Sequence, residues 1–158
     1  MILRLVHPAR SLSGPLDVAA RDYQKRISRH LRVDERFVKP ARIKHEGAAA
    51  VKGAIEQEGE RILAAVGPRD VLVALEVTGV SESSEALAKR LDGWMNSGAK
   101  AVAFALGGPW GLSDAVRARA RISLSLGPLT LPHELARVVL WEQLYRAGTI
   151  NRGEPYHK

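Results

Sequence analysis

The sequence predicts one α/β domain with a mainly parallel sheet and helices on both faces. Short apolar segments alternate with longer segments of helical composition, which is typical of successive strand–helix units. Val71–Val77 is almost continuously apolar, as expected of a central strand that is buried on both sides. The 158 residues suit one compact domain, and they contain no linker, repeat or low-complexity segment. We therefore assign residues 1–158 to a single domain.

The first part of the chain is expected to contain two strands joined by a helix. Met1–His7 is rich in isoleucine, leucine and valine, which favour buried strands. Ser13-Gly14-Pro15 interrupts the chain, and a segment of helical composition follows over Leu16–Leu31. Val33–Val38 is expected to be the second strand, and a polar, basic loop at Lys39–Gly47 comes after it.

The middle of the chain continues this alternation. Ala48–Val66 carries apolar residues on one face and is expected to be a helix that a Gly-Pro pair ends. After the strand Val71–Val77, Ser83 or Ser84 is expected to cap a helix that runs to about Asn96, because a serine side chain accepts a hydrogen bond from a free N–H of the first turn. Ala101–Leu106 is a further apolar strand.

A glycine-rich turn, Gly107–Gly111, opens the last third of the chain. A short helix is expected at Asp114–Ala120, with a serine before it as the cap, and Ile122–Leu126 is expected to be the last strand. The loop Gly127–Pro132 then leads to a long helix at His133–Ala147. Residues 151–158 form a polar tail.

Composition favours a nucleic-acid partner. The chain has 24 Lys and Arg against 17 Asp and Glu, a net charge of +7, which attracts polyanions, although such a charge also serves solubility alone. There is no cysteine, so disulfides, zinc–thiolate clusters and thiol nucleophiles are excluded. The five histidines have no metal-binding spacing, and we expect no metal. No apolar run suits a membrane span or a signal peptide, so we expect a cytoplasmic protein with no membrane partner.

Three loops at the carboxyl ends of predicted strands are candidates for a ligand site, because open α/β sheets bind ligands at that edge. They are Leu75–Gly79, Leu106–Gly111 and Leu126–Pro132. Glycine allows close approach of the backbone to a ligand, and Leu75, Leu129 and Leu131 could enclose an adenine ring. The glycine-rich turn matches neither a dinucleotide fingerprint nor a P-loop, and by itself it is equally compatible with a plain tight turn.

The last helix is apolar on two faces, which predicts two covered sides. Its apolar residues are Leu135, Val138, Val139 and Tyr145 on one face, and Ala136, Leu140, Leu144 and Ala147 on the other. We expect the sheet to cover one face and a second copy of the chain to cover the other, giving a homodimer. The alternative is a single deep core helix.

Basic residues suggest where RNA could bind. A stripe on the first helix, made of Arg21, Lys25, Arg29 and Arg32, is partly compensated by nearby aspartates and is interpreted as a solvated face. The loop with Lys39, Arg42, Lys44 and His45 is less compensated and is the preferred RNA backbone contact.

The C-terminal third contains several specific motifs, namely Leu106-Gly107-Gly108-Pro109, Gly111-Leu112-Ser113, Leu124-Ser125-Leu126, Leu129-Thr130-Leu131-Pro132-His133 and the run from Leu144-Tyr145-Arg146-Ala147 to Pro155-Tyr156-His157. Through these motifs the chain resembles the ribosomal RNA large subunit methyltransferase H family, of the SPOUT class. This resemblance implies an α/β fold with a C-terminal deep trefoil knot, and a homodimer. It also implies that S-adenosylmethionine is used to methylate N3 of a pseudouridine in the helix 69 loop of 23S rRNA on the assembled ribosome.

The resemblance also assigns site residues by position. The methyl-donor positions are Leu75, Gly108, Gly127, Pro128, Leu129, Thr130, Leu131 and Pro132, and those near the target base are His133, Arg146, Tyr156, His157 and Lys158. A histidine, His133 or His157, could accept the N3 proton, and Arg146 could stabilise the anionic base.

Two residues depart from the family pattern. Trp110 replaces an acidic or polar residue, and Lys158 replaces an arginine that could bind phosphate with two parallel hydrogen bonds. The alternative functions are a SPOUT methyltransferase of another RNA, such as tRNA, and a non-catalytic RNA-binding protein of ribosome assembly.

Overall fold

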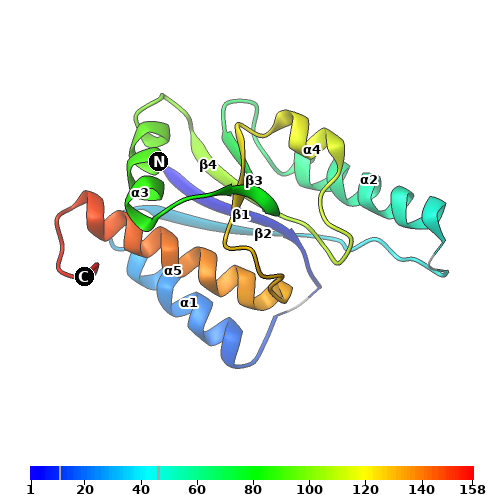
Figure 1. The fold of residues 1–158 in the computed structure, drawn as a ribbon, viewed down its shortest axis with the longest axis horizontal. Helices are drawn as coiled ribbons and strands as arrows, with labels where there is room; N and C mark the ends of the chain where they lie inside the picture. The colour runs from blue at the N-terminus through cyan, green and yellow to red at the C-terminus, as the bar shows by residue number, and fades with distance from the viewer. Residues whose placement is uncertain (11, 46) are drawn as a thin grey trace.

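The computed structural model describes residues 1–10, 12–45 and 47–158, and its centre is a five-stranded, all-parallel sheet (Figure 1). The strand order is β2-β1-β4-β3-β5, and every neighbouring pair is parallel. The strands are β1 (Ile2–Pro8), β2 (Arg32–Val38), β3 (Val71–Ser81), β4 (Ala101–Leu106) and β5 (Ile122–Ser125). The predicted parallel α/β sheet is therefore confirmed.

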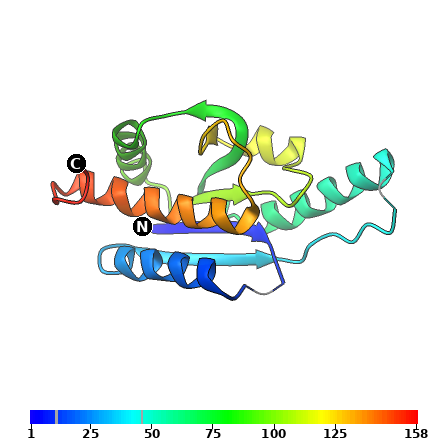
Figure 2. The same ribbon diagram turned by 60° about the horizontal axis from the view of Figure 1, so that its bottom comes forward.

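Helices cover both faces of the sheet, as predicted (Figures 1 and 2). They are α1 (Pro15–Ile27), α2 (Ala48–Ala64), α3 (Ser84–Met95), α4 (Asp114–Arg119) and α5 (His133–Asn151). One core lies under α1, α3 and α5, and it contains Leu3, Leu5 and Phe104. The other lies under α2 and α4, and it contains Leu72 and Ala103. Successive strand residues thus enter opposite cores, as the twofold period of a strand requires.

Serine caps begin two helices at the expected positions. The Ser83 hydroxyl accepts from the Ala86 N–H at 3.2 Å and begins α3, which settles the choice between Ser83 and Ser84. The Ser113 hydroxyl accepts from the Val116 N–H at 3.3 Å and begins α4.

Three elements end four residues away from the predicted position. α1 ends at Ile27 rather than Leu31, because the N–H groups of His30 and Leu31 both turn back to the Ile27 carbonyl. α5 continues past Ala147 to Asn151, since Ile150 packs against the core and keeps the last turn docked. Helix propensity is a property of the local sequence and does not include such tertiary contacts.

The third difference is in β3, which extends to Ser81 rather than Val77. Its pairing with β5 shifts register between Leu75 and Val80, after which Val80 and Ser81 rejoin the ladder. A Cβ on Gly79 would lie 2.7 Å from the Leu124 carbonyl carbon, so this close approach requires glycine. The shift displaces the segment after Leu75 from the regular ladder, and that segment forms one wall of the site described below.

The two apolar faces of α5 are covered unequally within one chain. Leu140, Leu144 and Ala147 are buried in the core with Trp141. The other face, made of Leu135, Val138, Val139 and Tyr145, is only half-buried. The single chain therefore covers one face fully and leaves apolar surface on the second.

Truncation of Leu140 tests the importance of the α5 core. Leu140 is 0% exposed, so Leu140→Ala should lower the free energy of unfolding by about 2–5 kcal/mol through lost burial and a cavity. Val18 on α1 is 68% exposed, and Val18→Ala should change the free energy of unfolding by no more than about 0.5 kcal/mol. Urea unfolding at one fixed protein concentration measures both. Equal losses would contradict this description of the core.

Candidate active site

A cleft opens at the carboxyl ends of β3 and β4. It consists of two adjoining cavities, of about 780 and 90 Å³, that share Leu75, Leu106 and Leu131 in their walls. The loop after β5 closes one side. The larger cavity has the size of an ordinary small-molecule site. This is the edge of the sheet where the sequence predicts a ligand.

Seven of the eight expected methyl-donor residues line this cleft, namely Leu75, Gly108, Gly127, Leu129, Thr130, Leu131 and Pro132. Pro128 instead faces a neighbouring hollow beside Ser83 and Ser84. Gly127 has a φ of +133°, which an L side chain rarely adopts, and so lets the chain turn sharply into the cleft wall.

The glycine-rich turn brings backbone rather than side chains to the cleft. The Gly111 N–H donates to the Gly108 carbonyl at 3.0 Å and closes the turn. A Cβ on Gly107 would lie 2.6 Å from the Gly111 carbonyl carbon and oxygen, so no side chain fits there. The segment is a tight turn and a cleft wall at once.

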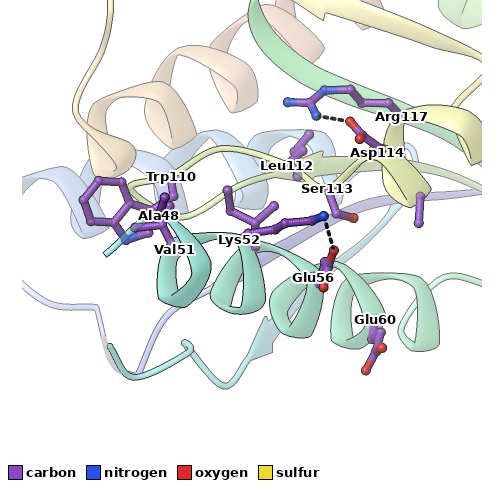
Figure 3. Close-up of a pocket in the computed structure, with 12 residues that line it drawn as sticks. Ala48, Val51, Lys52, Glu56, Glu60, Trp110, Leu112, Ser113, Asp114 and Arg117 are labelled. Carbon is purple, nitrogen blue, oxygen red and sulfur yellow. Dashed lines mark hydrogen bonds and ion pairs between the residues drawn. The ribbon is translucent and has the colours of Figure 1, made fainter. Parts of the chain in front are cut away.

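Trp110 lies outside the cleft. Figure 3 shows its indole beside Ala48 and Val51, at the start of α2, in a separate hollow between α2 and α4. The indole is 42% exposed. The departure from the family pattern at this position therefore alters a different surface and leaves the cleft wall intact.

Glu58 is a cleft residue that the sequence prediction missed. It is only 6% exposed, and its Oε1 accepts from the Ala41 N–H at 2.8 Å. Its Oε2 lies 2.6 Å from where a Cβ on Gly108 would be, and it makes no hydrogen bond to any side chain or backbone group among the described residues. In the sequence Glu58 is a lone carboxylate between Ile55 and Ile62 on the apolar face of α2, and this position could have marked it as a candidate site residue.

His133 begins α5 and borders the cleft, but both of its ring nitrogens are engaged. Nδ1 is 3.0 Å from the Gly107 carbonyl and Nε2 is 2.7 Å from Nδ1 of His7. Burial, followed by the charge of His7, lowers the pKa of His133. His133 does not cap the helix, since Pro132 occupies that position without a side-chain cap. No ring nitrogen of His133 is free to accept a proton from a ligand in the cleft.

An ion-pair network that was not predicted from the sequence lies beneath His133. Arg137 is 1% exposed and binds both carboxylate oxygens of Glu35, at 2.5 and 2.7 Å. Its third nitrogen is 2.9 Å from Asp17. Burial raises the pKa of Glu35, but hydrogen bonds from Arg137, His7 and Gln24 outweigh it and hold that pKa well below its usual range.

Three of the other expected residues meet at the far end of α5. Arg146 pairs with Glu142 at 2.6 Å and its guanidinium stacks over the Tyr156 ring at 4.7 Å. The Tyr156 hydroxyl donates to Glu142 at 3.1 Å. Nδ1 of His157 is 3.4 Å from Arg146. Burial raises the pKa of Tyr156, and Glu142 adds to the effect, so this phenol is a hydrogen-bond donor at neutral pH. We call Arg146, Tyr156, His157 and the exposed Lys158 the tail cluster.

The tail cluster does not reach the cleft of its own chain. His133 and Arg146 are separated by thirteen residues of continuous helix, which corresponds to about 20 Å. Figures 1 and 2 show the C-terminus beside the start of β1, at the end of the molecule opposite the carboxyl ends of the strands. The five residues expected near the target base therefore form two groups within one chain.

Basic side chains lie at the rim of the cleft. Lys39, Arg42, Lys44 and His45 are exposed, and Pro40 among them lines the cleft. Arg21 and Lys25 of the predicted basic stripe lie on α1, but Arg29 and Arg32 lie beyond its end, and all four are exposed. Asp17 and Asp22 form ion pairs with Arg21 and Arg26, so part of the expected compensation is present.

The described residues contain neither a helix suited to span a membrane nor a cluster of metal-binding side chains. None of their helices is long and apolar enough to cross a membrane. Across residues 1–10, 12–45 and 47–158, no group of three or more histidine, aspartate or glutamate side chains converges in a way that could hold a metal ion.

Comparison with known proteins identifies the family. The family model described as Predicted SPOUT methyltransferase matches residues 1–157. A protein of Anaeromyxobacter sp. strain Fw109-5, named Ribosomal RNA large subunit methyltransferase H, is 45% identical over 158 residues, the whole of both chains. A protein of the same name from Hahella chejuensis is 43% identical over 159 residues, covering 100% of this chain and 99% of that one.

A solved structure supports the fold. A probable methylase family protein from Haemophilus influenzae superposes with a TM-score of 0.60 at 17% identity, covering 99% of this chain and 70% of that one. The likeness at this identity concerns the fold alone. Because the family model and the relatives match over essentially the full length, the chain belongs to the SPOUT methyltransferases, in the family of the ribosomal RNA large subunit methyltransferase H proteins.

Proposed function

We propose that the protein uses S-adenosylmethionine to methylate 23S rRNA of the large ribosomal subunit. The observation that carries the proposal is the cleft, which seven of the eight expected donor residues line. The name of the full-length relatives supports an rRNA substrate. We assign the reaction to N3 of a pseudouridine in the helix 69 loop, on the assembled ribosome, because the sequence motifs imply it.

The residues of the cleft suit this methyl donor. Leu75, Leu106 and Leu131 offer apolar surface to an adenine ring, and the backbone at Gly108 can approach the ligand closely. The unpartnered Oε2 of Glu58 would accept a hydrogen bond from a ribose hydroxyl or from the ammonium group of the donor. Once bound, S-adenosylmethionine supplies an activated methyl group. The chain must then position the target base in line with it.

The target nitrogen has to lose a proton, and the tail cluster is the better candidate for this step. The nitrogens of His133 are engaged inside the protein, whereas those of His157 face the half-buried Arg146 at 3.4 Å and the solvent-exposed Glu85 at 2.8 Å. Contacts this close to the surface can be exchanged for a substrate at little cost. We propose that His157 takes the N3 proton and that Arg146 faces the developing negative charge.

A homodimer would bring the tail cluster to a cleft. Within one chain the two groups are about 20 Å apart along α5, and the second apolar face of α5 is only half-buried. Antiparallel contact between the α5 helices of two copies would cover this face. It would also place the tail of each copy near the cleft of the other. We propose that each active site combines the cleft of one chain with the tail cluster of its partner.

We also propose that the C-terminal chain forms the deep trefoil knot that the sequence motifs imply. From β4 the chain passes through α4 to β5, beyond β3 in the sheet. It then returns past the ends of β3 and β4, where residues 126–132 line the cleft, before α5 packs between α1 and α3. Such a crossing of connections is unusual outside knotted folds.

The rim loop Lys39–Lys44 is proposed to contact the RNA backbone. It is exposed, basic and continuous with Pro40 in the cleft wall, so phosphates bound there would lie next to the site of reaction.

The reaction itself is tested by mapping methylated nucleotides. Ribosomes from cells that lack the protein should miss one methyl group in the helix 69 loop of 23S rRNA. Adding the purified protein and S-adenosylmethionine should restore it, as measured by mass spectrometry of nuclease fragments. Restoration on tRNA instead would assign another substrate. Absence of any transfer, together with intact RNA binding, would favour a non-catalytic assembly protein.

Glu58→Gln tests the proposed donor site. The glutamine still accepts from Ala41 but loses the charge, so the Kd for S-adenosylmethionine should rise roughly ten- to a hundredfold, as loss of a charge-assisted hydrogen bond costs about 1.5–3 kcal/mol. Glu56→Gln, at an exposed position of the same helix, is the matched control and should bind normally. Calorimetry measures both. An unchanged Kd in Glu58→Gln would remove Glu58 from the site.

Mixing two inactive variants tests the shared active site. Arg146→Ala damages the tail cluster and Gly108→Val fills the cleft beside Glu58. Each homodimer should be inactive. After the two are unfolded together and refolded, half of the dimers should be mixed and hold one intact site, so about a quarter of wild-type activity should return. Light scattering should give a dimer mass. A monomer mass, or no recovery in demonstrably mixed dimers, would contradict the shared site.

A further inference from the structure

His7 has no role in the function proposed so far, yet it is fully buried beside the cleft. It lies near the carboxyl end of β1, with 0% exposure, and its ring contacts the rings of Phe37 and His133 at centroid distances of 5.0 and 4.9 Å. Its Nδ1 is 2.7 Å from Nε2 of His133, and its Nε2 is 3.1 Å from Oε1 of Glu35. The two histidines thus form a continuous hydrogen-bonded chain.

Both ends of this chain are acceptors. At one end the Gly107 carbonyl receives Nδ1–H of His133, and at the other end Glu35 faces His7. Glu35 must be ionised, because Arg137 binds both of its oxygens and Gln24 donates to the second one at 2.7 Å. Neither end can therefore provide a proton to the chain.

The number of protons in the chain follows from the number of hydrogen bonds. There are three, from Gly107 through His133 and His7 to Glu35, and each requires one hydrogen. Two neutral imidazoles carry only two ring hydrogens between them. The pair must hold a third, and it therefore carries one positive charge.

The surrounding charges lead to the same result. The buried Arg137 faces two carboxylates, Glu35 from β2 and Asp17 from α1, and Asp17 receives further compensation from Arg21 at the surface. A positive charge on the histidine pair balances Glu35, whose burial as an uncompensated anion would be costly. The remaining carboxylates near His133 are Glu58 of α2 and Glu76 of β3, which line the same cleft.

We infer that His7 and His133 share one proton and act as a single buried cation, which fixes His133 as a hydrogen-bond donor to the Gly107 carbonyl and so positions the glycine-rich wall of the cleft. His7 is then a positioning residue for the methyl-donor site. Only this last step rests on the proposed function. Glu35 lies next to His7 and favours the extra proton on that ring, and the lowered pKa of His133 agrees with this placement.

The proton count can be measured on the wild-type protein without any ligand. Long-range ¹H–¹⁵N spectra distinguish protonated from unprotonated ring nitrogens. At pH 7 we expect His7 with both nitrogens protonated and His133 with Nδ1 alone protonated. Two neutral rings at positions 7 and 133 would overturn the inference, whether or not the protein binds S-adenosylmethionine.

The positioning role is tested with His7→Phe. Removal of the donor to His133 should make the amides of residues 107–111 exchange with solvent at least tenfold faster, and the Kd for S-adenosylmethionine should rise about tenfold. The amide of Gly127, in another wall of the cleft, is the internal control and should be unaffected. Glu35→Gln should give the same pattern, with His7 neutral in the spectra.

Two results would limit this role. If amide exchange becomes faster throughout the sheet, His7→Phe is generally destabilised. The shared proton is then tested by the wild-type spectra alone. If the wild-type protein shows the shared proton but binds no S-adenosylmethionine, the proposed donor fails and the histidine pair stands.

Discussion

The placement of α5 sets the distance between the cleft and the tail cluster, the two groups of proposed functional residues. The helix is buried on one side against α1, α3 and the sheet, and it spans the molecule from the cleft to the C-terminus. Its first turn supplies His133 and Arg137 to the cleft end, and its last turns support Arg146 and Tyr156 at the other. Because a helix is rigid, these two ends cannot approach each other within one chain. The proposed pairing of two copies would overcome this separation, which the length of this one element sets.

The buried ion pairs give α5 its register on the sheet. Arg137 reaches Glu35 on β2 and Asp17 on α1, and His133 reaches Gly107 after β4. A shift of α5 by one turn would leave these charges buried without partners, which is far more costly than a shift between apolar surfaces. Apolar packing provides most of the stability, and the charged contacts select one position.

Much of the fold could be predicted because local signals agreed with tertiary structure. Serines marked the starts of α3 and α4, and apolar segments marked four of the five strands, whereas β2 is largely charged and was predicted from Val33, Phe37 and Val38. The end of β3 could not be predicted, since it depends on how β5 pairs beyond the register shift. The loops that line the cleft could be predicted because their glycine and leucine patterns are local. Glu58 and His7 were missed because their partners, Ala41 and His133, are distant in the sequence. The sequence also placed the tail and the cleft in one segment without showing the distance that α5 puts between them.

The wall of the cleft at Gly107 is positioned by His133, a residue that is synthesised late. His7 and Glu35 leave the ribosome early during synthesis, but their network stays incomplete until His133 and Arg137 have emerged and α5 has docked. Until then Glu35 lacks its ion-pair partner Arg137, and the Gly107 carbonyl lacks its hydrogen-bond donor His133. A nascent or truncated chain that lacks α5 would form much of the sheet but leave this wall of the cleft without its hydrogen-bond donor. The proposed ligand site would therefore be completed only after α5 has been made and has docked.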